Sequence, residues 1–305
     1  LGTALQEQGR LAEAVAHYRA ALRLQPALTE AHCNLGHALS DQGHLVEAVE
    51  CYREALRLQP DHAEALSNLV HQMQHLCDWS EWSDLCARLR SIIRNTPSAV
   101  TVPFAVLAIP SAPAEQLASA RAWAADRLAP VERLRAGLGF HFTRDPHQKP
   151  RLGYVSAGLR EHATGYLIAE LFELHDRGRF EVFAYSIGPD DRSPMRRRLE
   201  QACDHFRDIN TVGFAEAARR IYADEIDILV DLNGYTGGGR PQIFALRPAP
   251  VQVSYLGYPG TLGADFMDYV ISDRVLTPPG MEAHFAEQVV CLPHSYQIND
   301  RQRAM

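Results

Sequence analysis

The sequence lacks any apolar run of about 18 residues, the length that a membrane-spanning helix needs. It also lacks a secretory signal peptide at its start. We therefore expect a protein that neither enters a membrane nor is secreted, and we place it in the cytoplasm. The chain starts at Leu1 in the middle of a repeat unit, so we expect it to be part of a longer protein.

An excess of positive charge is absent too. Lysine and arginine number 30 against 37 acidic residues, which gives a net charge of −7. A nucleic-acid-binding protein needs a basic surface, so this class is excluded. The six cysteines form no Cys-x-x-Cys pair, and three lie inside helical patterns, where cysteine acts as a small apolar residue. Free thiols in a reducing compartment are therefore predicted rather than a disulfide framework.

An internal repeat is the first feature that is present. Units 1–34 and 35–68 align without a gap: LGTALQEQGRLAEAVAHYRAALRLQP in the first matches LGHALSDQGHLVEAVECYREALRLQP in the second. A period of 34 residues is that of the tetratricopeptide repeat. Gly9 and Gly43 lie where one helix turns into the next, and Pro26 ends a second helix. The repeats predict an α-helical solenoid.

The segment after the second repeat is helical but lacks the glycine and the terminal proline. It is typical of a capping helix pair that closes a solenoid, which gives a first domain over residues 1–95. His71 and His75 are four apart on one helix face, a metal-ligand spacing, but HQMQH has no Glu of a zinc-protease motif. We interpret them as ordinary polar residues of a helix. Residues 96–150 are rich in proline and predict a helical linker.

From residue 151 the pattern changes to short, nearly continuous apolar runs, as in strands that are buried on both faces. Helical stretches separate several of these runs. Such alternation predicts a Rossmann-like, doubly wound parallel sheet over residues 151–305, with ligands beyond the carboxyl ends of its strands. The runs are RLGYVSAG, FEVFAYSIG, IDILVDLNG, VQVSYLGY and MDYVISD.

The loop after the first run carries His162, just before a helix expected to start near Thr164 or Gly165. The positive end of that helix should lower the pKa of His162. A neutral imidazole here can accept a proton or donate a hydrogen bond to an oxyanion, and Thr164 can cap the helix. The alternative is a capping loop with an incidental histidine.

Two further loops contain several glycines. The first, residues 233–240, is a candidate phosphate loop in which Gly238 frees main-chain N–H groups and Arg240 adds a charge, although a tight structural turn is the alternative. The second includes Gly257 and Pro259, where a sugar can approach the main chain, or where the chain simply turns between strands. All three loops are expected along one edge of the sheet.

Three other polar residues are candidates for structural roles. His205 lies on or beside a strand start and is interpreted as a hydrogen-bonded structural histidine. Asp227 and Asp231 are four apart, on one face of a strand. Because apolar residues flank them, we favour one capped, partly buried aspartate over a catalytic carboxylate pair.

Taken in order, these segments resemble the O-linked N-acetylglucosamine transferases. The repeats run into RLGYVSAGLREHATGYL, FEVFAYSIGPDD and ILVDLNGYTGGGRPQIFALRPAPVQVSYLGYPGT. The resemblance covers nearly the whole chain and is most specific in LRPAPVQVSYLGYPGT and in the repeats. It implies a two-lobed GT-B glycosyltransferase, with residues 151–305 as the N-terminal catalytic lobe and the nucleotide-binding lobe after Met305.

The resemblance also implies an activity. Members of the family move N-acetylglucosamine from UDP-N-acetylglucosamine to Ser or Thr hydroxyls of proteins, with inversion and without a metal or other cofactor. His162 then matches a base or substrate-positioning histidine, and Thr164 a threonine near the donor. The donor-sugar pocket is matched by Leu256, Gly257 and Pro259. The repeats match a surface that holds protein or peptide acceptors.

The sequence departs from this pattern in two places. The animal enzymes carry an aspartate where this chain has Gly158, and a histidine in the segment matching residues 102–110, where this chain has none. A second hypothesis therefore stands beside the enzyme: a tetratricopeptide interaction scaffold that has lost catalysis.

Overall fold

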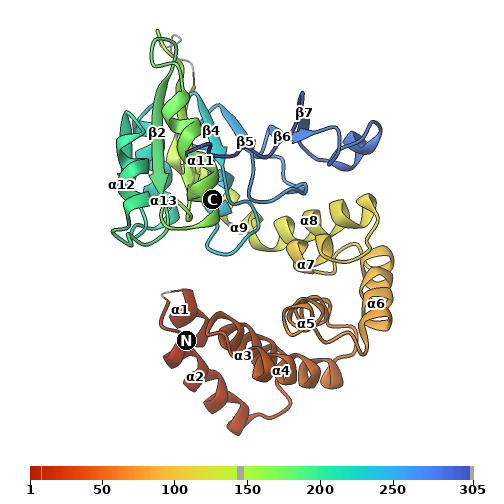
Figure 1. Ribbon diagram of the computed structural model, residues 1–305. Helices are drawn as coiled ribbons and strands as arrows, with labels where there is room; N and C mark the ends of the chain where they lie inside the picture. Colours follow the sequence, from red (N-terminus) through yellow and green to blue (C-terminus); the bar gives the residue numbers. More distant parts are fainter. Residues whose placement is uncertain (8, 143–147, 303–305) are drawn as a thin grey trace. The chain divides into compact units, whose positions relative to one another are not determined.

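The computed structural model describes residues 1–302 except for residue 8 and residues 143–147. The chain divides into two compact units, Leu1–Trp123 and Ala124–Met305 (Figure 1). The predicted linker, residues 96–150, is divided between these units, and its residues 143–147 lie outside the described residues. Within the described part of the chain, no helix combines the length and the apolar character that crossing a membrane requires.

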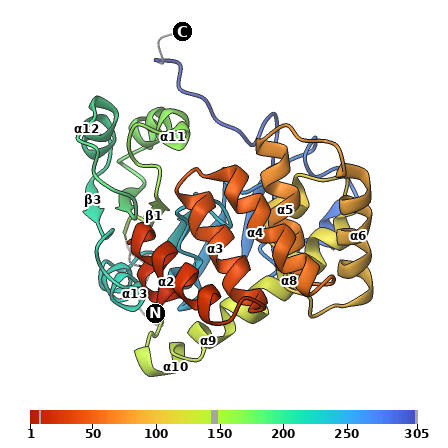
Figure 2. The same ribbon diagram turned by 90° about the horizontal axis from the view of Figure 1, so that it is seen from below.

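The first unit is a series of helices in which each of the first six packs against the next, as the repeat predicts (Figure 2). Its buried seam includes Tyr18, Leu39, Tyr52 and Leu66, all at least nine-tenths buried. A short helix that packs on α5 follows the paired helices. A helix of 15 residues comes next and crosses from the first unit into the second. The helices are α1 (Gly2–Glu7), α2 (Leu11–Leu24), α3 (Thr29–Asp41), α4 (Leu45–Leu58), α5 (Ala63–His75), α6 (Trp82–Asn95), α7 (Pro103–Leu107) and α8 (Pro113–Arg127).

The third helix pair, α5 and α6, keeps the geometry of the repeats without their glycine. Gly9 and Gly43 turn the chain between helices with φ of 74° and 80°. Cys77 stands at the same place in the third pair and has φ of 54°. A left-handed conformation is uncommon for a residue with a side chain, so packing of the helix pair maintains the turn that glycine favours elsewhere.

The second unit contains a parallel seven-stranded sheet with the order β3-β2-β1-β4-β5-β6-β7, which confirms the predicted Rossmann-like fold. All five predicted strands are present, and β3 begins at the histidine placed near a strand start. The strand β7 was not predicted. The strands are β1 (Arg151–Ser156), β2 (Glu181–Ser186), β3 (His205–Asp208), β4 (Ile228–Asp231), β5 (Val251–Ser254), β6 (Tyr269–Asp273) and β7 (Gln288–Leu292).

Helices cover both faces of this sheet, and Figure 2 shows α11 and α12 on one side of β1 and β3 and α13 on the other. One face packs Tyr154 and Ala184 against α11 and α12. On the opposite face, the Tyr185 hydroxyl donates to Asp224, which directly follows α13, at 2.8 Å. The helices are α9 (Ala129–Glu132), α10 (Arg135–Leu138), α11 (Ala163–Leu174), α12 (Pro194–Gln201), α13 (Phe214–Ala223) and α14 (Pro241–Ala245), with a 3-10 turn η1 (Met281–His284).

The strand order reverses between β1 and β4. From β1 the chain proceeds outward through β2 and β3, and from β4 it proceeds the other way through β5, β6 and β7. The loops that follow β1 and β4 therefore lie at the topological switch point of the sheet. The carboxyl edge at this point, where doubly wound sheets bind ligands in a crevice, is called the crevice below.

Candidate functional site

The three predicted loops meet at this crevice. The side-chain oxygen of Asn233, after β4, accepts a hydrogen bond from the Ala157 N–H, after β1, at 2.8 Å. A Cβ added at Gly238 would lie 3.1 Å from the Ala157 Cβ. A Cβ added at Gly257, after β5, would lie 2.2 Å from the Leu232 carbonyl oxygen. The expectation that the turns carrying His162, Gly238 and Gly257 share one rim of the sheet is confirmed.

His162 is the N-cap of α11 and is exposed. Its Nδ1 accepts a hydrogen bond from the Thr164 N–H at 3.2 Å. Because Nδ1 accepts, the proton of the neutral ring is on Nε2, which is left to donate outward. Partial desolvation and, secondly, the positive charge of Arg160 lower the pKa of His162. The ring is therefore neutral at physiological pH.

The predicted capping role of Thr164 is wrong. The helix begins at Ala163, one residue earlier than expected, and the imidazole of His162 takes the capping position. Thr164 lies in the first turn and is 8% exposed. Its closeness to the donor stays a prediction.

Gly158 has a steric role beside His162. A Cβ built at this glycine would lie 2.6 Å from His162 Nδ1 and 2.8 Å from the Thr164 Cβ. A side chain at position 158 is thus incompatible with the present capping geometry of the imidazole.

Sequence reasoning missed the contact that holds the β1–α11 loop in place. Asp191, in the loop between β2 and α12, accepts from the Glu161 N–H at 2.9 Å and from the Ser193 N–H at 3.0 Å. Desolvation raises the pKa of Asp191, but these hydrogen bonds and Arg160 outweigh it, so its pKa is lowered. The ionised carboxylate of Asp191 thus holds the main chain of Glu161, the residue before His162.

The β4–α14 loop is ordered by its own side chains. Gly238 has φ of 77°, which favours glycine. Arg240 donates from two guanidinium nitrogens to the carbonyls of Ile209 and Val212, at 3.1 and 2.6 Å. These bonds give Arg240 a structural role between two loops. Its contact with a phosphate, like that of Gly238, stays a prediction.

The β5–β6 loop presents its main chain at the crevice. Leu256 has φ of 72°, a strained conformation for a bulky residue, and strain of this kind clusters at ligand sites. Gly257 approaches the main chain of β4's loop too closely for any side chain, and Pro259 is exposed. The Leu256 side chain packs in the core, so the main chain is what this segment offers to a ligand.

A buried carboxylate anchors the far part of the same loop. Glu287 accepts from the Thr261 hydroxyl and from the Leu262 N–H, both at 2.6 Å. Burial raises the pKa of Glu287 despite these hydrogen bonds. Glu287 lies 26 residues beyond Thr261, so no local pattern in the sequence indicated the contact.

Asp231 ends β4 inside the crevice floor. It accepts from the N–H groups of Asn233 and Gly234, at 2.9 and 3.0 Å, and burial raises its pKa to about 6. Asp227, at the other end of the strand, accepts from the Arg151 N–H at 2.8 Å. The two carboxylates therefore form no catalytic pair, as the sequence predicted, and Asp231 supports the turn.

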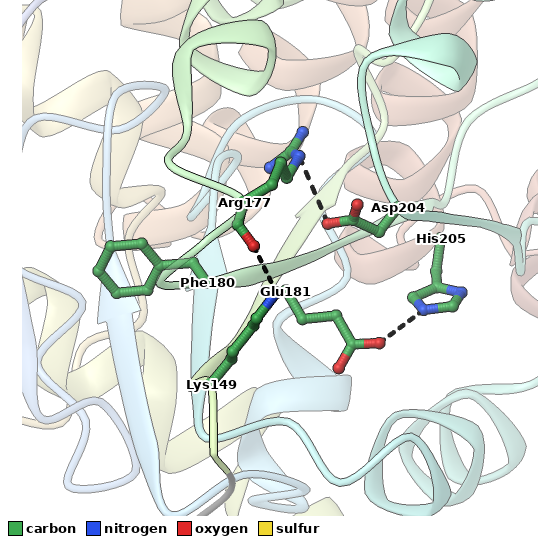
Figure 3. Close-up of a pocket in the computed structure, with 6 residues that line it drawn as sticks. All are labelled: Lys149, Arg177, Phe180, Glu181, Asp204 and His205. Carbon is green, nitrogen blue, oxygen red and sulfur yellow. Dashed lines mark hydrogen bonds and ion pairs between the residues drawn. The ribbon is translucent and has the colours of Figure 1, made fainter.

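The opposite, amino edge of the sheet has a cavity of about 450 Å³. Figure 3 shows the imidazole of His205 directed at Glu181, with Nε2 2.8 Å from the carboxylate. The ring also stacks on Phe183 at 4.3 Å. His205 is thus the structural histidine that was predicted, away from the crevice.

Several known proteins share this arrangement. Residues 76–305 match the model of Glycosyl transferase family 41. Residues 2–43 match a TPR repeat model, and residues 29–62 a tetratricopeptide repeat model. A solved mutant of Thermobaculum terrenum O-GlcNAc transferase aligns with a TM-score of 0.67 and 29% identity, over 97% of this chain and 56% of that one.

Curated relatives are similar over about three quarters of the chain. The probable UDP-N-acetylglucosamine–peptide N-acetylglucosaminyltransferase SEC of Arabidopsis thaliana is 37% identical over 240 residues, which are 75% of this chain and 24% of the relative. The UDP-N-acetylglucosamine–peptide N-acetylglucosaminyltransferase of Caenorhabditis elegans is 36% identical, over 74% of this chain and 21% of its own length. The chain thus spans about a quarter of these relatives.

Proposed function

The chain belongs to glycosyl transferase family 41, and from this premise we propose that the protein moves N-acetylglucosamine from UDP-N-acetylglucosamine to Ser or Thr hydroxyls of proteins, with inversion of the anomeric centre. The observation that carries the proposal is the exposed, neutral His162 at the switch point of the sheet, capping α11 with one ring nitrogen and presenting the other.

The role proposed for His162 follows from its tautomer. An Nε2–H group donates a hydrogen bond and cannot take the proton of an attacking hydroxyl. We therefore assign it to positioning the substrate by a hydrogen bond, rather than to general-base catalysis. Loss of one preorganised donor of this kind costs about 100-fold or more in rate.

The donor sugar is proposed to lie against the β5–β6 loop. The sugar is proposed to contact main-chain groups at Leu256 and Gly257, because the Leu256 side chain packs in the core and leaves the main chain of this segment to face a ligand, and exposed Pro259 borders them. Thr164 lies in the first turn of α11 beside His162. The leaving diphosphate would be met by helix N-termini and basic side chains rather than by a metal, and the reaction as proposed needs no cofactor.

Protein or peptide acceptors are proposed to bind the tetratricopeptide repeats of the first unit. Consecutive repeats build extended surfaces that hold polypeptides, and the repeat models match residues 2–62. A cytoplasmic location is proposed with the same function, since the acceptors would be intracellular proteins.

The test is transfer of radiolabelled N-acetylglucosamine from UDP-N-acetylglucosamine to a Ser- and Thr-containing peptide by the intact protein. We expect transfer by the wild type and at least a 100-fold loss with His162→Asn. Asparagine is a good N-cap and so keeps the helix, but it lacks the outward Nε2–H. Full activity of His162→Asn contradicts the assigned role, and absence of both transfer and UDP binding in the wild type supports the interaction scaffold instead.

A further inference from the structure

The helix α5 carries two histidines whose rings converge. His71 and His75 are one turn apart, and their Nε2 atoms are 3.3 Å from each other. The rings stand edge to face, with centroids 4.6 Å apart. Spacing alone had suggested two ordinary polar residues, and it does not show how close the ring nitrogens lie. In the structure the two Nε2 atoms are close enough to contact one ion.

The distance suits two ligands of one metal ion. Bonds of about 2.1 Å from a Zn²⁺ ion to nitrogens 3.3 Å apart subtend an angle of about 105° at the metal. This angle lies between the octahedral and tetrahedral values. The same distance fits an N–H···N hydrogen bond between the rings, so the geometry permits both states. When an ion binds, the Nε2 proton of the donating ring moves through solvent to Nδ1 of that ring, so that both rings stay neutral and both Nε2 atoms coordinate.

The surroundings favour a ligand pair. The ring of His71 stands edge to face with the ring of Phe104, with centroids 5.8 Å apart. This contact already restricts the His71 side chain, so that ion binding costs less side-chain entropy. His75 is exposed to solvent, which gives an ion access.

We propose that His71 and His75 form a binding site for a borderline divalent transition-metal ion of the Zn²⁺ and Cu²⁺ class. Imidazole nitrogen suits these ions. Among the described residues no third His, Cys, Asp or Glu joins the pair in a metal-binding group, so water or a bound polypeptide completes the coordination. The site lies in the helical-repeat unit, takes no part in sugar transfer and is independent of the function proposed above.

The test is calorimetric titration of the untagged 305-residue chain with Zn²⁺ and, separately, Cu²⁺. Cys77 is exposed and two residues beyond His75, so the reference protein carries Cys77→Ser to remove the thiol. We expect one Zn²⁺ per chain, tighter binding of Cu²⁺ as the Irving–Williams order requires, and at least a tenfold loss of affinity for both ions in His71→Ala and in His75→Ala.

The matched control is His17→Ala, which removes an exposed histidine of α2 and should leave both affinities unchanged. Circular dichroism checks that each variant is folded. Affinity in His71→Ala or His75→Ala equal to that of the reference protein would overturn the proposal, and so would the absence of saturable binding by the reference protein. Activity of the transferase is not a readout, so failure here leaves the proposed function untouched.

Discussion

Substitution of Gly257 by alanine tests the packing of the crevice. The new Cβ would lie 2.2 Å from the Leu232 carbonyl oxygen and 3.2 Å from the Asn233 Cα. A normal van der Waals contact between this Cβ and the Leu232 oxygen needs about 1 Å more than 2.2 Å. The obstructing atom belongs to the main chain, which cannot move aside as a flexible side chain can. Overpacking of this kind costs about 1–3 kcal/mol, and we expect the upper end of that range because one of two strand-end loops has to shift.

The assay uses the placement of the tryptophans. Trp79, Trp82 and Trp123 all lie in the first unit, so their fluorescence follows unfolding of the repeats, whereas circular dichroism follows both units. In urea, Gly257→Ala should lower the midpoint of the transition seen only by circular dichroism and leave the fluorescence transition in place.

The matched control is Gly237→Ala in the neighbouring loop. No atom lies within 4 Å of a Cβ built there, so its effect should stay within about 0.5 kcal/mol of the wild type. If Gly257→Ala is as stable as Gly237→Ala, the close approach of the β4 and β5 loops described here is incorrect.

Three further predictions concern stability. Burial raises the pKa of Asp231 to about 6, so its stabilising contribution is full only well below pH 4 and is lost as pH rises through 6. Relative to Asp231→Asn, the wild type should lose about 2 kcal/mol of its free energy of unfolding between pH 4 and pH 7 in urea titrations, and a constant difference would refute this. Arg196→Ala should lower the free energy of unfolding by about 2 kcal/mol in urea titrations. This loss is smaller than that for a fully buried ion pair, because the partners Glu200 and Asp208 are 41% and 42% exposed. An unchanged midpoint would show that these ion pairs contribute nothing. Gly43→Ala places a side chain at φ of 80° with no atom nearby. Backbone strain alone should therefore lower the free energy of unfolding seen by tryptophan fluorescence by about 1 kcal/mol. A variant as stable as the wild type would argue against the left-handed turn.

The sequence predicts the regular parts of this fold well, because periodic patterns report buried faces directly. The period of 34 residues indicated the helical repeats, and five apolar runs indicated the central strands. The strand β7 was missed for a physical reason: it is an edge strand with exposed and half-buried positions. Its apolar run, VVCL, is only four residues long, and a 3-10 turn stands in place of the α-helix that strand–helix alternation would put before it.

The site was predicted at the level of loops but not of atoms. Parallel strand order brings the turns of His162 and Gly257 together, and the sequence sufficed for that. The hydrogen bond from Thr164 to Nδ1, which fixes the tautomer, depends on where the helix begins, and the expected start was one residue late. The hydrogen bonds that Asp191 and Glu287 accept join residues 30 and 26 apart along the chain, respectively. Local patterns in the sequence do not extend over such separations.

The most direct test of the account is a structure of the intact protein with UDP-N-acetylglucosamine and an acceptor peptide. The account predicts a sugar or acceptor oxygen within about 3 Å of His162 Nε2, with Nδ1 still accepting from the Thr164 N–H and the sugar against Leu256 and Gly257. A sugar bound away from the carboxyl edge of β1, β4 and β5, or an imidazole whose Nδ1 faces the substrate instead, would contradict it.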